Sequence, residues 1–535
     1  MIKCLFKILE GIILYLYEFI QLFINVFFSP LPPTKDSPRI GHVAVIGAGI
    51  TGISTAAHLR SHGFEVTIFD ESPDIGGIWR RVNSTSNLQI NSLFYRFHPL
   101  AFYRSFYPFR DEILAQQHKV LTTYGLDKCI RFNTRVTKIE RHSSSSSQDS
   151  KIGGPSRWIV NGNKSEVFDG LVVTIGTCGK PRIISLPNQD QFKGKIIHSC
   201  ELDDLDYTGK SVVVIGGAAS GVEVAETAVA KGAKKATILA RSDKWFIPRN
   251  VILDSCLSMF PYIFKTLTTL VPEQLIRRLH YRDLEEKMTP TFPLYSSTPV
   301  VNNAFFRLVR QGSADYHRGE VTSVKSDGLE WNYRLRSQRK GEEGEKKFIN
   351  ADIIVLASGY HRPSMDFLPK DLFPDGYSSP NMYLQCFPVH DPSIVCTNAT
   401  YVDGFGSVGS LHIGIYARLL ALFLRRPETR PSSQFMRFWV DTVRIFKRGF
   451  FGGPLEFFTY PEVCIWLAAC MLQCPERIPY FFFVMFGFGE WYVAKDGSSR
   501  FRYPIMNFWS RIMKQLHRVP LERPQFYIPG PQQRV

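Results

Sequence analysis

An α/β fold with two parallel sheets is predicted by three features of the chain. First, an apolar strand twice runs into a glycine-rich turn that opens a helix, at residues 43–52 and at 212–221. Second, each of these helices is followed by another apolar strand, at 65–69 and at 236–239. Third, two more strands of this kind lie at 171–175 and 353–356. Because strands separated by helices pair in parallel, this order predicts two Rossmann-like dinucleotide-binding domains.

The first glycine-rich turn has the composition of a phosphate-binding turn. Residues 47–52 read Gly-Ala-Gly-Ile-Thr-Gly. Gly47 allows the tight turn, Gly49 allows a pyrophosphate to approach the backbone, and Gly52 lets the helix pack closely on the strand. Asp70 ends the next strand, where an acidic side chain binds ribose hydroxyl groups. The residues expected at this site are Gly47, Ala48, Gly49, Gly52 and Asp70.

A second pair of glycines follows shortly after Asp70. The segment 76–79 reads Gly-Gly-Ile-Trp. Consecutive glycines let the backbone lie against a planar ligand, although an ordinary turn has the same composition. Gly77, Ile78 and Trp79 are therefore candidates for the same nucleotide site.

The second glycine-rich turn departs from the first at its middle position. Residues 216–221 read Gly-Gly-Ala-Ala-Ser-Gly, so that Ala218 stands where Gly is usual and its methyl group restricts the approach of a phosphate. The candidate ligands are Gly216, Ala218, Ser220 and Gly221. Arg241 follows the next strand, where a guanidinium would hold a 2′-phosphate, and this favours NADPH over NADH. A solvated charge at a strand end is the alternative for Arg241.

The N-terminal segment is apolar and aromatic from Ile8 to Phe28, about the length that crosses a bilayer. Glu18, Gln21 and Asn25 share one helical face, so the helix could instead lie flat in the membrane interface. A buried core helix is a third interpretation. The basic residues on either side of the segment do not predict an orientation.

The composition limits the remaining function classes. A chain of 535 residues predicts two or three domains, and its net charge of +16 suits anionic partners. The basic residues are dispersed, so no nucleic-acid partner is expected. The 10 cysteines contain no Cys-x-x-Cys pair, and we expect neither a metal site nor a disulfide framework. The segment after Glu428 is crowded with aromatic residues and could belong to the core, a partner surface or a membrane-dipping region.

Further motifs resemble those of the flavin-containing monooxygenases. Residues 192–198 match Phe-x-Gly-x-x-x-His, residues 76–79 resemble the family's Gly-Gly-hydrophobic-Trp segment, and Gly359 belongs to an Ala-Ser-Gly-Tyr sequence like its Ala-Thr-Gly-Tyr motif. The resemblance covers about residues 41 to 425. Two departures are Ala218 and Leu202, since the family has an aromatic residue at the latter position and related Baeyer–Villiger enzymes have Trp there.

This resemblance implies FAD at the first turn, NADPH at the second, and an NADPH domain inserted into the FAD domain. The expected parts are a membrane-anchor or amphipathic helix (1–30), the FAD domain in two pieces (41–205 and 341–428), the NADPH domain (206–340), and an aromatic-rich, membrane-associated C-terminal segment (429–535).

The resemblance also implies a reaction. NADPH and O₂ would generate a flavin hydroperoxide that oxygenates an amine nitrogen or a thioether sulfur of a small molecule, with the protein positioning and shielding the cofactor. Asn87 resembles the family's active-site Asn, with Asn91 as a competitor for that role and a turn-forming Asn as the alternative. His198 is expected to be a structural contact between domains and not a base.

Other functions remain open at this point. They are a Baeyer–Villiger oxygenase of ketones, an NADPH oxidase that produces hydrogen peroxide, a disulfide reductase, and a non-enzymatic membrane protein with a degenerate fold. The absence of a redox-active cysteine pair argues against the reductase. Membrane lipid is the expected macromolecular partner, a homo-oligomer is left open, and the endoplasmic reticulum, with the catalytic domains facing the cytosol, is the expected location.

Overall fold

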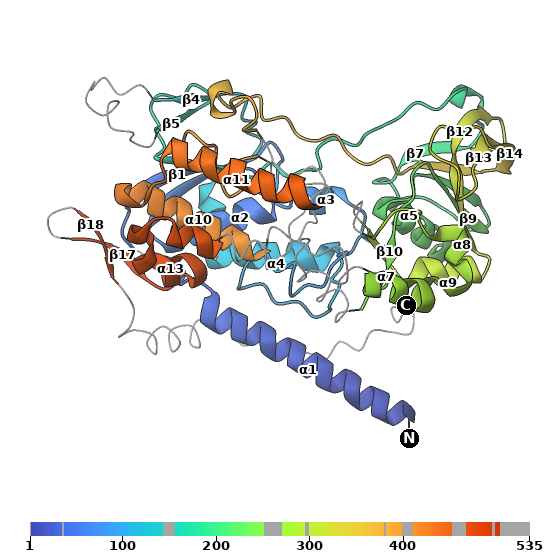
Figure 1. The fold of residues 1–535 in the computed structure, drawn as a ribbon, viewed down its shortest axis with the longest axis horizontal. Coiled ribbons are helices and arrows are strands. Elements are labelled where there is room, and N and C mark those ends of the chain that lie inside the picture. The colour runs from blue at the N-terminus through green and yellow to red at the C-terminus, as the bar shows by residue number, and fades with distance from the viewer. Residues whose placement is uncertain are drawn as a thin grey trace.

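The computed structural model describes residues 2–34, 37–142, 156–250, 270–294, 299–378, 381–397, 410–451, 467–494 and 498–502. Two lobes lie side by side and are joined by two extended segments, with helix α1 (Ile2–Phe28) lying beneath the first lobe (Figure 1). Each lobe contains one of the predicted parallel sheets. The fold class is therefore α/β with Rossmann-like topology, as predicted.

The first lobe is built on a five-stranded parallel sheet. Its spatial order is β16 (Ile394–Cys396), β6 (Gly170–Val173), β1 (Gly41–Ile46), β2 (Phe64–Phe69) and β3 (Ile130–Arg131). β1 pairs with both β2 and β6 and is the central strand. The first glycine-rich turn, which follows β1 directly, therefore lies at the centre of one edge of the sheet. Four helices of this lobe are α2 (Ile50–Ser61), α3 (Ile78–Arg81), α4 (Arg110–Thr123) and α10 (Ser410–Arg425). A small hairpin of β4 (Ile139–Arg141) and β5 (Trp158–Val160) adjoins the sheet.

The second lobe is built on a seven-stranded sheet. Its order is β14 (Glu345–Asn350), β13 (Gly328–Tyr333), β12 (Ala314–Lys325), β9 (Lys235–Ala240), β8 (Ser211–Ile215), β15 (Ile353–Leu356) and β7 (Lys195–His198). The strands from β12 to β7 pair in parallel, whereas β12, β13 and β14 form an antiparallel meander. The lobe also contains α5 (Ala219–Ala230), α7 (Leu270–Ile276), α8 (Glu285–Met288), α9 (Ala304–Arg310) and the short pair β10 (Phe246–Ile247) and β11 (Val300–Val301).

The second sheet extends beyond the boundaries of 206–340 that the sequence predicted for its domain. β7 precedes that range, and β14 and β15 follow it. A short apolar strand looks the same in either sheet, and only its pairing shows where it belongs.

The described part of the aromatic-rich C-terminal segment packs against the core of the first lobe. Its described elements are α11 (Ser433–Phe451), η9 (Pro475–Tyr480), α13 (Phe481–Phe486), β17 (Glu490–Val493) and β18 (Ser499–Arg502). Phe483 and Trp491 are buried with their ring centroids 6.0 Å apart, and both pack against Phe501. These aromatic rings therefore serve packing within the lobe.

Candidate functional site

The first glycine-rich turn can only be built from glycine at its two ends. Gly47 has φ of +106°, a conformation that side chains other than glycine rarely adopt. A Cβ on Gly52 would lie 1.8 Å from the carbonyl oxygen of Gly47. The Thr174 hydroxyl, at the end of β6, donates to the carbonyls of Ile46 and Gly47 at 2.8 and 3.1 Å and fixes the turn from the neighbouring strand.

The Gly-Gly segment lies directly against this turn. A Cβ on Gly77 would come within 3.1 Å of the Gly49 Cα, and the Gly76 N–H donates to the Ala48 carbonyl at 3.2 Å. Helix α2 starts at this point without a side-chain cap, so its first N–H groups are available to a phosphate. Together these backbones form a narrow cradle of the kind that a pyrophosphate requires.

The predicted acid is part of the turn itself. Asp70, at the end of β2, accepts hydrogen bonds from the N–H of Ala48 at 2.6 Å and of Ser72 at 2.7 Å. It therefore holds together the loops that follow β1 and β2, and each of its oxygens has a further lone pair.

Ile78 and Trp79 occupy α3, next to the cradle. Trp79 is buried, and its Nε1 donates to the Tyr95 hydroxyl at 2.8 Å with the two rings edge to face. Ile78 is half-buried and packs against the core of the first lobe. Both side chains therefore support the wall beside Gly77.

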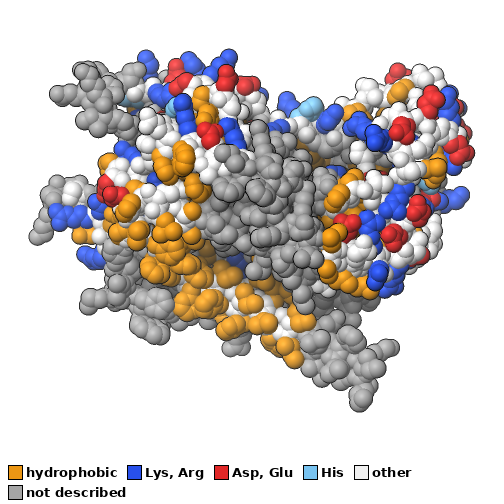
Figure 2. Space-filling view, viewed as in Figure 1, with side chains coloured by type: hydrophobic (Ala, Val, Ile, Leu, Met, Phe, Trp, Pro, Cys, Tyr) orange, Lys and Arg blue, Asp and Glu red, His pale blue; other side chains and the backbone are white. Residues whose placement is uncertain are grey.

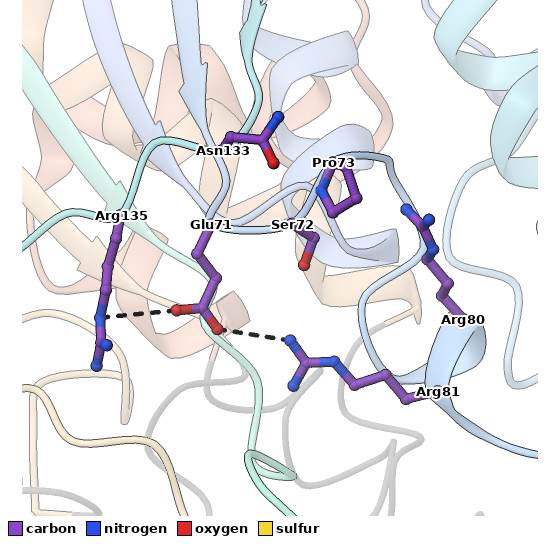
Figure 3. A pocket seen from close by; sticks show the side chains of 7 residues that line it. All are labelled: Glu71, Ser72, Pro73, Arg80, Arg81, Asn133 and Arg135. Atoms are coloured by element: carbon purple, nitrogen blue, oxygen red, sulfur yellow. Dashed lines mark hydrogen bonds and ion pairs between the residues drawn. The ribbon is translucent and has the colours of Figure 1, made fainter.

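A basic pocket opens beyond the end of β2 (Figure 3). Its lining residues are Glu71, Ser72, Pro73, Arg80, Arg81, Asn133 and Arg135. Glu71 lies between Arg81 and Arg135, at 3.5 and 3.7 Å from their guanidinium nitrogens. The pocket adjoins Asp70 in the chain, since Glu71 and Ser72 line it. We did not predict Arg80, Arg81 or Arg135 from the sequence; the Arg-Arg pair directly after Trp79 was the available signal.

The second turn repeats the geometry of the first despite its alanine. Gly216 has φ of +124°, and a Cβ on Gly221 would lie 1.9 Å from the Gly216 carbonyl oxygen. Ala218 has φ of −88° and ψ of −173°, close to the −73° and −178° of Gly49. Its methyl group is exposed, and Ser220 lies in the first turn of α5, which is also uncapped. The methyl group of Ala218 thus narrows the approach of a phosphate to the turn without changing the backbone conformation.

Arg241 follows β9 with an exposed side chain. Its carbonyl accepts a hydrogen bond from the buried Arg334 at 2.6 Å, which fixes the backbone while the Arg241 guanidinium extends into solvent. This position is at the edge of the second turn, where a 2′-phosphate would project.

The two lobes meet along a seam formed by residues 83–89 of the first lobe. The Asn83 side chain donates to the Ser199 carbonyl at 2.8 Å and accepts from the Leu202 N–H at 3.0 Å. Ser86 donates to Glu223 on α5 at 2.5 Å. Burial in this seam raises the pKa of Glu223, although its hydroxyl donors act in the opposite direction.

Asn87 lies within this seam. Its Oδ1 accepts a hydrogen bond of 2.9 Å from Nη2 of Arg249, which lies on the second lobe beyond β10. Arg249 is also held by Asn303, whose Oδ1 accepts from the Arg249 backbone N–H at 2.8 Å. The competitor Asn91 is fully buried, and its Oδ1 accepts from the N–H groups of Leu93 and Phe94. Asn87 therefore spans the lobes, whereas Asn91 shapes a turn.

Gly359 lies where the two connecting segments cross. Its φ is +80°, and its carbonyl accepts from the Arg182 N–H at 2.9 Å and contacts Nε2 of His198 at 3.1 Å. Pro181 and Tyr360 form an isolated bridge between the segments. His198, the last residue of β7, thus contacts the segment that follows the neighbouring strand β15, while Gly359 also bonds the connection to the first lobe.

Two turns with matching backbones, each opening an uncapped helix at the carboxyl end of a parallel strand, define a protein that binds two dinucleotides. Residues 40–436 match the family described as flavin-binding monooxygenase-like, and the chain belongs to that family.

Similar proteins of known sequence include FAD-binding monooxygenase ktnD of Aspergillus niger, 23% identical over 59% of this chain and 57% of that protein. Flavin-containing monooxygenase FMO GS-OX1 of Arabidopsis thaliana is 27% identical over 40% of this chain and 52% of that protein. Flavin-containing monooxygenase 1 of Mus musculus is 25% identical over 69% and 71%. The alignments thus span little more than half of the first two relatives.

Solved structures share the fold at low sequence identity. Oxidised steroid monooxygenase bound to NADP superimposes with a TM-score of 0.61 at 18% identity, over 82% of this chain and 98% of that one. OTEMO in complex with FAD and NADP gives 0.60 at 16%, over 81% and 98%.

Proposed function

We propose that the chain is an FAD- and NADPH-dependent monooxygenase. The observation that carries this proposal is the pair of equivalent glycine turns on two lobes that are hydrogen-bonded to each other along residues 83–89. Family membership and the FAD and NADP of the OTEMO complex support the assignment of the two ligands.

The residues fit these two cofactors. The cradle of Gly47, Gly49 and Gly77 is closed to any side chain larger than hydrogen at two of its positions, and it would hold the FAD pyrophosphate with Ile78 and Trp79 behind it. Asp70 would accept from the ribose. Gly216, Ala218, Ser220 and Gly221 would hold NADPH, with Arg241 at its 2′-phosphate.

When bound, the flavin supplies the oxygen chemistry, after reduction by the nicotinamide. The chain supplies position and exclusion of water. Asn87, held by Arg249, presents its amide between the lobes, where it can donate from Nδ2 without a change of charge. Gly359 fixes the backbone of the connection between the two lobes, and this connection sets how the two nucleotide sites are oriented to one another.

Amine nitrogen and thioether sulfur are the proposed acceptors of oxygen. Leu202 supports this choice over ketone oxygenation, since it stands where Baeyer–Villiger enzymes have Trp. It is fully buried in the core of the second lobe and bonded to Asn83, so it is a structural anchor of the seam. A ketone oxygenase is the second candidate, because solved structures of similar fold include cyclohexanone monooxygenase.

The test is NADPH consumption in air by the flavin-loaded protein with matched panels of tertiary amines, thioethers and cyclic ketones. Oxygenated amine or thioether is the expected product. Lactone or ester from the ketone would support the second candidate. Peroxide formation at the same rate with every substrate would identify an NADPH oxidase, and a folded chain that does not retain added FAD would refute the proposal.

We also propose a division of the chain that follows the sheets. The FAD domain comprises the strands β1 to β6 and β16 with the C-terminal elements, and the NADPH domain runs from β7 to β15. Residues 1–30 are proposed to associate with a membrane, and the endoplasmic reticulum with both lobes in the cytosol is the proposed site. One helix is long and apolar enough to cross a bilayer among the described residues, at 11–28.

A further inference from the structure

The polarity of helix α1 is inverted relative to a helix on a water-soluble surface. Among residues 11–28, the exposed side chains are all aliphatic or aromatic: Ile12, Ile13, Leu14, Tyr15, Leu16, Phe19, Leu22 and Phe23. Gln21 and Asn25, which are polar, are buried. A helix in water has its polar residues outside, so the outer face of α1 is built for an apolar medium.

The inner face of α1 is hydrogen-bonded to the first lobe from Tyr17 to Asn25. The Tyr17 hydroxyl donates to the Ser105 carbonyl at 2.8 Å. Gln21 donates to the Tyr103 carbonyl and accepts from the Tyr103 N–H, both at 2.9 Å. Asn25 donates to the Leu100 carbonyl at 3.1 Å. These bonds satisfy backbone groups of the lobe itself, so α1 is an integral part of its surface.

This attachment excludes a bilayer that surrounds the helix. Tyr17, Gln21 and Asn25 all lie within the stretch that is long enough to span. A spanning helix would have to break these bonds and expose its polar groups to hydrocarbon, where each unsatisfied group is costly.

The apolar surface continues beyond α1. The Phe28 ring contacts Phe486 and Phe488, with centroids 5.7 and 6.4 Å apart, and Phe482 on α13 is 59% exposed. In the second lobe, Val271, Leu275 and Leu279 are exposed at i, i+4 and i+8 along α7 and the turn that follows it. Helices α1, α13 and α7 lie toward the same lower side of the molecule, where Figure 2 shows apolar side chains gathered along α1.

We propose that α1 lies in the plane of a bilayer, with its outer face (Ile12, Leu16, Phe19 and Phe23 at its centre) immersed in the boundary between headgroups and acyl chains. This inference deepens the membrane association proposed above and adds its geometry. A bilayer fits better than a second copy of the chain, because the exposed face from Ile12 to Phe23 consists of large aliphatic and aromatic side chains, without the repeated small residues that set a helix–helix register. The net charge of +16 favours a surface with anionic lipid.

The first experiment measures flotation of the full-length, flavin-loaded chain with sealed vesicles of phosphatidylcholine, with and without phosphatidylserine. The variant L16S/F19S should reduce the vesicle-bound fraction by about tenfold or more, because two large apolar side chains are removed from the buried face. The matched control I183S/F438S changes two side chains that are equally exposed but lie away from α1, and it should bind as the parent does. Equal binding by both variants would overturn the proposal.

The second experiment decides between lying in the plane and spanning. A protease-cleavable tag at the N-terminus should be cut from outside sealed vesicles, on the same side as the two lobes. A protected tag would show a spanning helix and overturn the proposal. A change in subunit association caused by L16S/F19S, without a change in vesicle binding, would assign the face to a second copy and overturn it as well.

Flavin content, measured by absorbance on the same samples, separates this inference from the proposed reaction. Vesicle binding by a chain without flavin would refute the monooxygenase and leave the in-plane helix standing. A flavin-loaded chain that does not bind vesicles would refute the in-plane helix and leave the monooxygenase standing.

Discussion

The guanidinium of Arg249 and the amide oxygen of Asn87 are 2.9 Å apart and form a hydrogen bond between the two lobes. Each belongs to a lobe with its own glycine turn, so the bond links the two lobes that carry the proposed cofactor sites. Arg249 also faces Glu226 on α5, whose pKa is raised by burial and lowered in part by this guanidinium.

We predict that Arg249 and Asn87 act as a unit. R249A and N87A should each slow the reduction of bound flavin by NADPH about tenfold, measured by anaerobic stopped-flow, because a charge-assisted bond is worth about 1.5–3 kcal/mol. The double variant should lose little more than either single variant. R249K, which retains the charge, should recover part of the rate. Fully additive losses would show that the bond does not couple the lobes.

The variant G49A should lose flavin without unfolding. A Cβ at Gly49 would find its nearest neighbour, the Gly77 Cα, at 3.6 Å, an ordinary contact, and the backbone angles suit alanine. The methyl group would nevertheless enter the space of the pyrophosphate. We expect a melting temperature of the apoprotein close to the parent's and a yield of bound FAD lower by about tenfold. The comparison is G52A, which clashes with the Gly47 carbonyl and should fail to fold. Full flavin retention by G49A would place the cofactor elsewhere.

Arg241 should control the choice between NADPH and NADH. R241A should raise the KM for NADPH by about tenfold and leave the KM for NADH nearly unchanged, since only the 2′-phosphate loses a partner. R241K should give an intermediate value. Equal effects on both nucleotides, measured by steady-state oxidation, would identify Arg241 as a solvated charge at a strand end.

Stability should fall in mild acid because of buried histidines in the first lobe. Burial lowers the pKa of His98 to about 3, with Arg418 and Arg96 acting in the same direction, and burial also lowers the pKa of His58. A folded pKa below the unfolded value of about 6.5 means that the neutral form stabilises the fold above pH 6.5. For His98 this stabilisation is lost as the pH falls from 6.5 toward 3, by about 1.4 kcal/mol per pH unit, and His58 acts in the same direction.

The variant H98N tests this dependence, because an amide oxygen can replace Nδ1 as acceptor for the Leu100 N–H. Its melting temperature should decline less steeply than the parent's between about pH 6.5 and pH 5. The same slope in both proteins would mean that His98 does not titrate on unfolding.

The sequence predicted the parts of the fold whose local pattern is unambiguous. Both glycine turns and the strands around them lie where we expected, since strand, turn and helix alternate at the spacing that the nucleotide site requires. The sequence did not show that β7 and β15 belong to the second sheet, because the partners of a strand depend on long-range pairing. The crowding of aromatic residues near Phe483 gave no sign of whether it faced lipid or core.

The seam was also beyond prediction from the sequence. Asn83, Ser86 and Asn87 look like an ordinary polar loop, and Glu223 looks like a solvent-exposed residue of a helix. Only the docking of the second lobe against that loop brings these residues into contact with Ser199, Glu223 and Arg249.

The hydrogen bonds between α1 and the first lobe have a consequence for producing the protein in soluble form. Removal of residues 1–28 would remove the exposed apolar face of α1. It would also remove the side chains that form hydrogen bonds with the backbone of the loop from Leu100 to Ser105. That loop follows Asn91 in the chain, and Tyr17 touches Ser92 directly. A shortened chain would thus gain solubility but lose order in this loop, whereas polar substitutions on the outward face of an intact α1 would preserve the loop.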